Sequence, residues 1–411
     1  MMKKITSLLC IGLVALAAVS CHKDPAPAPP MSPAEQQQKL CDAAVTSLQE
    51  IDPDNWRSFA ETVLGISVSL QRVEPGNTGE LADLMESWFL SVQKGDHLET
   101  SIYTFQLSKL KGELTVKNNV YVYTASDKPL TFVYDYKGKT YKASFEATEG
   151  DPTIYEIGRS ENTVESYKEV EVYRAVIPTH AAVHVTENAV TFIDLTLDPT
   201  VKDLNKDGVL DMTDQVQLNA LLTIPGYRLS VSQLDITSKE ASTHLELFHG
   251  KKSVVAADLR GTLSLRQVVN ESLSAPLSEA AFTTVNGEIR HLSGEVILKG
   301  DVDNEKAAII QTYNLSTEGE AKKAAALLEQ AIHAELYYDN NPTLQAQYCV
   351  IVSYDAYESA WYLENGIHFF DGSPDMRLED FFNAQDFKPL MNEINSFTGK
   401  LTMYFYPYFS H

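Results

Sequence analysis

Residues 203–214 carry oxygen-bearing side chains at the spacing of a calcium-binding loop. A hard cation such as Ca²⁺ takes about six to eight oxygen ligands, so the chain must wrap around it. Gly208 occupies the sixth place, where the sharp turn of such a loop favours glycine. The ligands that this spacing predicts are Asp203, Asn205, Asp207, the backbone carbonyl of Val209, Asp211 and Asp214.

The charge of this segment supports the same interpretation. Its four carboxylates have only Lys206 as a neighbouring cation, so they would repel one another unless a divalent ion lay between them. Leu210 offers an apolar side chain that can hold the loop against a core. The residues from Gln215 to Leu222 favour a short helix after the loop. The alternative is an acidic surface turn with no ion, and a bound ion is expected to be structural.

The loop and the helix expected after it resemble the calcium loop of dockerin-type repeats. Asp214 ends the loop as in dockerins, where ordinary EF-hands place a bidentate glutamate. The resemblance implies one bound Ca²⁺. Dockerins carry two such loops and this chain has one, so their partner is not implied. The similar stretch 301–306 lacks the glycine and is expected to be a hairpin turn.

Residues 1–20 have the features of a secretory signal peptide. Lys3 and Lys4 precede an apolar run that is too short to span a bilayer. The sequence 18–21, Ala-Val-Ser-Cys, resembles the lipobox of bacterial lipoproteins, which implies lipidation of Cys21 and a membrane anchor. The alternative is an ordinary signal peptide followed by an incidental cysteine. Residues 22–24 loosely resemble the export signal of Bacteroidota surface lipoproteins, so the expected location is the outer membrane, facing outward.

The composition excludes one class of partner. The chain has 33 Lys and Arg against 56 Asp and Glu, and its formal net charge is −23. A surface of this sign repels nucleic acids and anionic lipids. Cys41 and Cys349 are the other cysteines after the signal peptide. In an oxidising compartment two such thiols are either joined by a disulfide or buried unpaired, and the sequence leaves both open.

The pattern of apolar residues predicts an α+β fold with mainly antiparallel sheets. A helical cap includes a helix from Thr78 to Gly95, and later segments predict a strand at 307–313, helices at 317–337 and 386–397, and a last strand at 401–409. One or two β-rich lobes are expected. The expected organisation is a signal peptide (1–20), a Pro-rich tether (21–31), a helical cap (32–95), a first β-rich lobe (96–200), a calcium-loop insertion (201–226) and a second α+β lobe (227–411).

No catalytic motif marks this chain as an enzyme. His180 and His184 would make a metal pair on a helix, but the segment from Thr179 to Thr186 is expected to be extended, which places them roughly 13 Å apart. No two carboxylates are distinguished as a glycosidase pair.

Three groups of aromatic residues have two interpretations. Exposed rings in a row could stack on sugars, whereas large aromatic side chains more often fill sheet cores. The core interpretation is favoured for each group. The groups are Phe132, Tyr134 and Tyr136; Tyr354, Tyr357 and Trp361; and Tyr404, Tyr406 and Tyr408.

The segment from Trp361 to Phe397, and the sequence Ala-Val-Ile-Pro at 175–178, resemble uncharacterised Bacteroidota envelope lipoproteins. That group carries no activity to transfer. The sequence therefore predicts a lipid-anchored envelope lipoprotein with a structural or binding role, one stabilising Ca²⁺, and a glycan or protein as partner. The alternative is a surface glycan-binding protein of a nutrient-uptake system, and a weaker one is a polysaccharide hydrolase.

Overall fold

The computed structural model describes residues 27–54, 56, 57, 59, 61, 62, 65 and 89–409, except for gaps at 96–97, 118–119, 151–152, 165–166, 212, 269–276, 311, 314 and 384. It confirms the α+β class, with mainly antiparallel sheets, an N-terminal helix and a few later helices. The chain forms two compact units. Unit 1 contains residues 1–54 and 239–403, and unit 2 contains residues 55–238 and 404–411.

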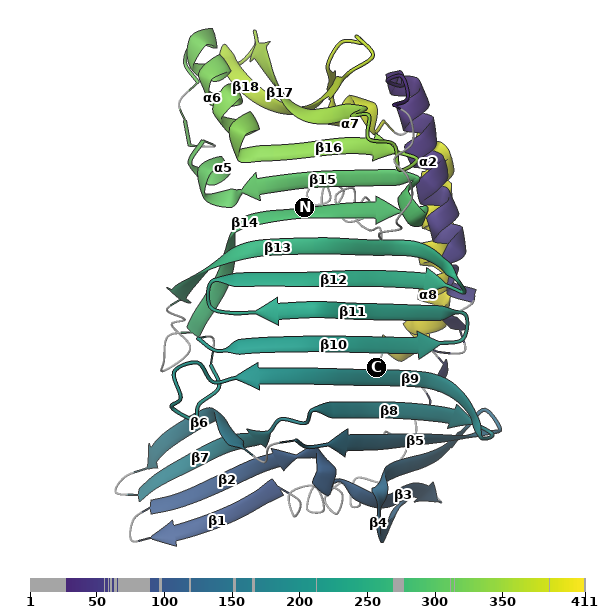
Figure 1. Cartoon of the computed structure of the whole chain (residues 1–411), viewed down its shortest axis with the longest axis vertical. Helices are drawn as coiled ribbons and strands as arrows, with labels where there is room; N and C mark the ends of the chain where they lie inside the picture. The colour runs from purple at the N-terminus through teal and green to yellow at the C-terminus, as the bar shows by residue number, and fades with distance from the viewer. Residues whose placement is uncertain are drawn as a thin grey trace. The chain divides into compact units, whose positions relative to one another are not determined.

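The larger sheet of unit 2 is antiparallel (Figure 1). Its strands are β3 (Lys111–Lys117), β4 (Val120–Tyr136), β5 (Lys139–Thr148), β8 (His180–Glu187), β9 (Val190–Lys202), β10 (Gln215–Ile224) and β11 (Tyr227–Ile236). They lie in the order β3-β4-β5-β8-β9-β10-β11. Lys137 and Gly138 join β4 to β5 with φ angles of 50° and 77°. Positive φ at both central residues is the geometry of a tight hairpin turn.

A second sheet of unit 2 has four strands in the order β1-β2-β7-β6. Their bounds are β1 (Leu90–Gly95), β2 (Leu98–Gln106), β6 (Ile154–Val164) and β7 (Tyr167–Val176), and a short 3-10 helix, η1 (Leu107–Lys109), follows β2. β2 and β7 pair in parallel. Ile102, Val170 and Val172 form the small core of this sheet.

Helical residues near the start of unit 2 contact aromatic side chains of the larger sheet. Tyr134 is buried on β4 and donates a hydrogen bond from its hydroxyl to the backbone carbonyl of Thr62, at 3.1 Å. The ring of Trp56 lies 5.0 Å from that of Tyr227. A tyrosine can be buried without an energetic penalty when its hydroxyl forms a hydrogen bond, as the hydroxyl of Tyr134 does here.

Unit 1 is an antiparallel meander in which each strand pairs with the next along the chain. Its strands are β12 (Glu240–His249), β13 (Lys252–Val268), β14 (Leu277–His291), β15 (Val296–Asp303), β16 (Ile332–Tyr338), β17 (Ala346–Asp355), β18 (Ala360–Phe369) and β19 (Met376–Arg377). Its other elements are α2 (Pro33–Glu50), η2 (Leu292–Gly294), α5 (Asn304–Ile310), α6 (Glu318–Ala331) and α7 (Leu378–Phe381), and α8 (Lys388–Phe409) begins in this unit.

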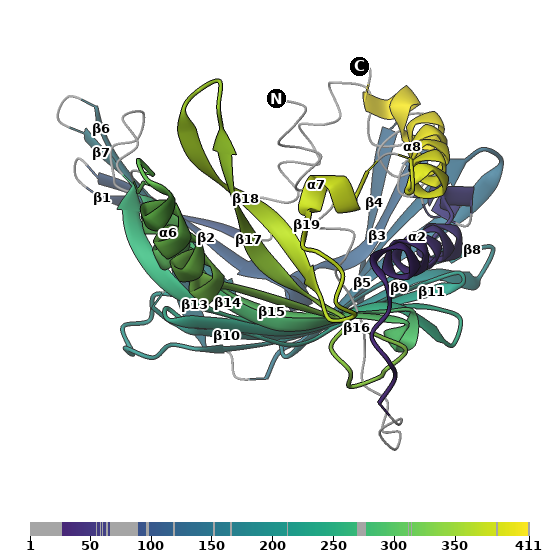
Figure 2. The same cartoon turned by 90° about the horizontal axis from the view of Figure 1, so that it is seen from above.

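Helices α2 and α6 lie on the same face of the unit 1 sheet (Figure 2). A capping box formed by Ser32 and Glu35 begins α2, because it satisfies backbone N–H groups that the first turn leaves free. Leu40 of α2 packs with Val296 and Tyr338 in the main core. Helices α5 and α6 form a second cluster, against which Val350 and Leu363 of the sheet pack.

Several local predictions are wrong. The segment after the loop is strand β10, and the helix predicted to end at Gly95 gives way to β1, since residues 90–95 are paired with β2. Residues 301–306 form the end of β15 and the start of α5, so the hairpin turn predicted there is wrong. The strand predicted at 307–313 is also wrong, because α5 continues to Ile310. The helix predicted over 317–337 ends at Ala331, and β16 follows. Residues 401–409, predicted to form the last strand, are the end of helix α8. In the same helix, the ammonium of Lys400 forms ion pairs with the carboxylates of Asp52 and Asp54, at 2.6 and 2.9 Å.

Candidate calcium-binding loop

The predicted calcium loop closes a β-hairpin of unit 2. Lys202 at the end of β9 lies opposite Gln215 at the start of β10, so Asp203 to Asp214 form the whole connection. An antiparallel pair places the two ends of its loop side by side. The hairpin therefore brings the first and last predicted ligands close together without the helix expected after the loop.

The first half of the loop is folded around side-chain oxygens. The Asp203 carboxylate accepts hydrogen bonds from the backbone N–H groups of Lys206 and Gly208, at 2.6 and 2.8 Å. Asn205 accepts from the N–H of Asp207 at 3.1 Å, and Asp207 accepts from the N–H of Val209 at 2.8 Å. Gly208 has a φ of 80°, which accounts for glycine at this place.

The second half is held by two more carboxylates. Asp211 accepts hydrogen bonds from the N–H and hydroxyl of Thr213, at 2.7 and 2.6 Å, and these bonds lower the pKa of the Asp211 carboxyl. Asp214 accepts from the N–H groups of Leu204 and Asp211, at 2.9 and 3.0 Å. Asp214 is only 3% exposed. This side chain joins the start of the loop to its end.

The loop is also paired with the four-stranded sheet of unit 2. The N–H of Glu156 on β6 donates to the carbonyl of Gly208 at 2.8 Å, and the N–H of Leu210 donates to the carbonyl of Glu156 at 2.7 Å. The backbone of Leu210 thus fixes the loop against a strand. The side chain of Glu156 accepts from Arg159 at 2.9 and 3.0 Å, which lowers the pKa of the Glu156 carboxyl.

The donor set fits a hard cation. Every predicted ligand atom is a carboxylate, amide or backbone carbonyl oxygen, and such atoms suit Ca²⁺ better than a soft metal. The carboxylates bond to N–H groups of the loop itself. Over the described part of the chain, no three His, Cys, Asp or Glu side chains form a group that could hold a metal. The prediction of a bound Ca²⁺ thus stays a prediction, and it rests on the spacing and the oxygen chemistry of the loop residues.

The predicted lipidation site, Cys21, lies outside the described residues. Among the helices that are described, none is long and apolar enough to cross a membrane. Cys41 and Cys349 are free and buried, which is the second of the two alternatives that the sequence leaves open. Cys41 packs into the main core from α2, and Cys349 lies on β17 beside Gly366. Burial raises the pKa of the Cys349 thiol to about 12.

The two histidines four residues apart lie on an extended strand, β8, as the sequence predicts. Each has its own partner across the β8–β9 pair. His180 lies 2.6 Å from Asp198, and His184 lies 3.1 Å from Asp194. These separate pairs tie neighbouring strands together.

The aromatic groups differ in their exposure. Phe132, Tyr134 and Tyr136 are buried, which confirms the core interpretation for that group. Tyr354 and Tyr357 are 51% and 96% exposed, so the core interpretation is wrong for them. The third group lies in helix α8, and its side chains are outside the described ones.

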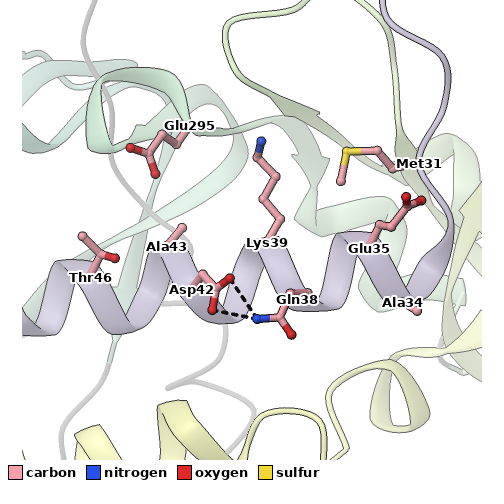
Figure 3. Close-up of a pocket in the computed structure, with 9 residues that line it drawn as sticks. All are labelled: Met31, Ala34, Glu35, Gln38, Lys39, Asp42, Ala43, Thr46 and Glu295. Carbon is pink, nitrogen blue, oxygen red and sulfur yellow. Dashed lines mark hydrogen bonds between the residues drawn. The ribbon is translucent and has the colours of Figure 1, made fainter.

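A shallow groove runs beside α2 in unit 1 (Figure 3). Its charged lining includes Glu35, Lys39, Asp42 and Glu295. The Lys39 ammonium forms an ion pair with Asp339 and lies 5.8 Å from the centre of the Tyr338 ring. The side chain of Asp42 accepts from Gln38 at 2.8 Å (Figure 3). These contacts stabilise α2 and attach it to the end of β16. The side chains named here do not place a nucleophile beside a base.

The sequence did not indicate a polar row across the sheet of unit 1. The strand register aligns Asp258, Glu288, Lys299 and Glu335 on four neighbouring strands. Glu288 pairs with Lys299 at 3.0 Å and with Arg290. Burial disfavours the charged form of Glu288, but the two ion pairs outweigh it, so the pKa of this carboxyl is lowered. Alternating polar residues could indicate a solvent face, but only the register brings these charges together.

These features were compared with known proteins. No protein-family model, no curated protein and no solved structure matches this chain.

Proposed function

We propose that this protein is a lipid-anchored lipoprotein of the bacterial outer membrane, with a structural or binding role, in which one Ca²⁺ stabilises the β9–β10 hairpin. The observation that carries the calcium proposal is the arrangement around Asp214. Its buried carboxylate joins both ends of a loop that bears three further aspartates. A cation among these carboxylates would remove their mutual repulsion.

The ion would act on more than the hairpin. Gly208 and Leu210 pair with Glu156 of β6, so the loop connects the two sheets of unit 2. A ligand that binds the folded state alone stabilises it by mass action. Calcium would therefore raise the melting temperature of unit 2.

The test is the thermal unfolding of the purified protein in EGTA and in millimolar CaCl₂, with MgCl₂ for comparison. Calcium should raise the melting temperature of the wild type, and Asp207→Ala should abolish that rise. Asp127 is an exposed aspartate of the same unit outside the loop, so Asp127→Ala is the matched control. Equal melting temperatures of the wild type with and without calcium would refute a bound ion.

The anchor requires a separate test, because it depends on Cys21 alone. Cells fed with radiolabelled palmitate should incorporate label into the wild type and none into Cys21→Ser. The labelled protein should fractionate with outer membranes. A protein that carries no label would refute the lipoprotein proposal and would leave the calcium proposal standing.

A second candidate function, binding of surface glycans, is favoured by one observation. The rings of Tyr354 and Tyr357 are exposed at the end of a projecting hairpin. For the third alternative, a polysaccharide hydrolase, the described groove beside α2 offers carboxylates, but Glu35 already accepts from Ser32 and Asp42 from Gln38.

A further inference from the structure

The β17–β18 hairpin extends well past the strands beside it. Its two strands pair from Ala346 and Phe369 to Asp355 and Ala360. β16 pairs with β17 only at Gln347 and Ala346, and β19 pairs with β18 at only two positions. Figure 2 shows the hairpin rising away from the sheet. A two-stranded ribbon is marginally stable in water, so the outer part of the hairpin requires contacts beyond the pairing of its own two strands.

The inner part of the hairpin has such contacts. Val350 and Leu363 pack against the cluster formed by α5 and α6. Farther out on the same face, Tyr354 and Trp361 lie directly opposite each other, with ring centroids 5.0 Å apart. Tyr354 is half exposed, and Tyr357 in the turn is almost fully exposed. These outer rings therefore add little to the core, unlike most large aromatic side chains.

The turn that carries these rings is ordered and acidic. The Asp355 carboxylate accepts hydrogen bonds from the backbone N–H groups of Tyr357 and Glu358, at 2.7 and 3.2 Å. Glu358 in turn accepts from the Tyr362 hydroxyl. Residues 346–366 contain no Lys, Arg or His. Asp355 and Glu358 therefore give the tip a net negative charge. A negative tip disfavours binding of anionic lipids, nucleic acids and acidic glycans, and two such tips would repel each other.

We infer that the tip of this hairpin, formed by Tyr354, Asp355, Tyr357, Glu358 and Trp361, is a binding site for a neutral oligosaccharide. Aromatic rings offer flat apolar surfaces to the apolar faces of sugar rings. The carboxylates of Asp355 and Glu358 have remaining lone pairs that can accept hydrogen bonds from sugar hydroxyls. The inference rests on the second candidate function and is independent of the calcium loop.

The position of the tip suits an anchored protein. In Figure 2 the hairpin rises on one side of the unit 1 sheet, while the chain that leads into α2 runs toward the other side. That chain is fixed to unit 1, because the N–H of Met31 donates to the side chain of Gln345 at 2.6 Å. A lipid attached upstream of Met31 would hold that side near the membrane and leave the aromatic tip facing away.

The test is affinity electrophoresis of the purified full chain in native gels that contain soluble starch, xylan, galactomannan or β-glucan. At least one of these neutral polysaccharides should retard the wild type. Tyr357→Ala combined with Tyr354→Ala should weaken retardation at least tenfold, and Tyr357→Phe should retain it because the ring remains. Tyr313 is 45% exposed elsewhere in unit 1, so Tyr313→Ala is the matched control.

Three results would overturn the inference. They are no retardation by any of the four polysaccharides, retardation that the double variant leaves unchanged, and binding only to polygalacturonate or to phosphatidylglycerol vesicles. Asp207→Ala should not alter retardation, so failure of the calcium proposal would be seen separately. Circular dichroism of the double variant should match that of the wild type, because the substituted rings lie outside the core.

Discussion

The carboxylate of Asp214 accepts a hydrogen bond from the backbone N–H of Leu204 at 2.9 Å, so the last residue of the candidate loop holds the second. The other oxygen of the same carboxylate accepts from the N–H of Asp211 at 3.0 Å. Asp214 is buried, so little water reaches its carboxylate to compete with these two N–H groups. The loop is thus closed by one side chain before any ion is considered.

Replacing Asp214 should destabilise the protein even without calcium. Asp214→Ala removes the acceptor of two N–H groups, and a hydrogen bond to a charged group contributes about 1.5–3 kcal/mol. Asp214→Asn should lower the free energy of unfolding by less, since the amide oxygen of asparagine can still accept one of the two hydrogen bonds. Urea unfolding in EGTA, followed by circular dichroism, measures both changes. An unchanged midpoint for Asp214→Ala would show that the loop closes by other contacts.

His291 should make the protein sensitive to mild acid. Burial, helped by the positive charge of Lys252, lowers the pKa of His291 from 6.5 to about 4. Between these values the unfolded chain binds a proton that the folded chain does not, so stability falls as the pH decreases. The full loss is about 3 kcal/mol below pH 4.

His291→Leu should flatten this part of the pH dependence. Urea unfolding at pH 7 and pH 4.5 would compare the variant with the wild type, with His333→Leu as a control because that side chain is 58% exposed. If His291→Leu loses as much stability as the wild type between the two pH values, the acid sensitivity comes from other groups.

Gln36 should hold the N-terminal segment to unit 1. Its side chain is fully buried and donates to the carbonyls of Met31 and Gln345, at 2.9 and 3.1 Å. Gln36→Ala should free residues 28–32 and speed their proteolysis several-fold. Gln38→Ala is the matched control on the same helix, because the Gln38 side chain donates to the exposed carboxylate of Asp42 on α2 itself. Equal rates of cleavage in both variants would show that Gln36 does not hold the segment.

The thiols of Cys41 and Cys349 should be unreactive in the folded protein. Burial raises the pKa of both, so neither thiolate forms readily near neutral pH. Both should react with Ellman's reagent after unfolding in guanidinium without a reductant. A disulfide would instead require reduction before either thiol reacts.

The sequence predicts the sharp turn at Gly208 correctly, because this turn follows from local chemistry. The spacing of oxygen-bearing residues forces a tight turn, and the positive φ of Gly208 is a property of one residue. These features need no knowledge of distant partners.

The strand after the loop shows where local patterns fail. Val216, Leu218, Ala220, Leu222 and Ile224 alternate in β10, as a strand with one apolar face requires. Leu221 lies on the opposite face, and counting it with Leu218 and Leu222 gives a helical period. Pairing with both β9 and β11 settles the choice, and that pairing is invisible in the segment itself.

The exposure of the aromatic residues could not be derived from their types. Tyr134 and Tyr357 are the same residue type, one buried under helical residues and the other standing in a turn. Tyr357 is exposed because the β17–β18 hairpin extends past the strands beside it. That extent depends on registers such as Ala346 opposite Leu336, which tertiary contacts determine.

The outer turn of the β17–β18 hairpin, from Ala356 to Ser359, belongs to neither of the two hydrophobic clusters described above for unit 1. Extra residues inserted there would lengthen an existing loop, and doubling a loop costs only about 0.6 kcal/mol in closure entropy. This turn is therefore a place where an epitope tag or a grafted peptide can be displayed without loss of the native state.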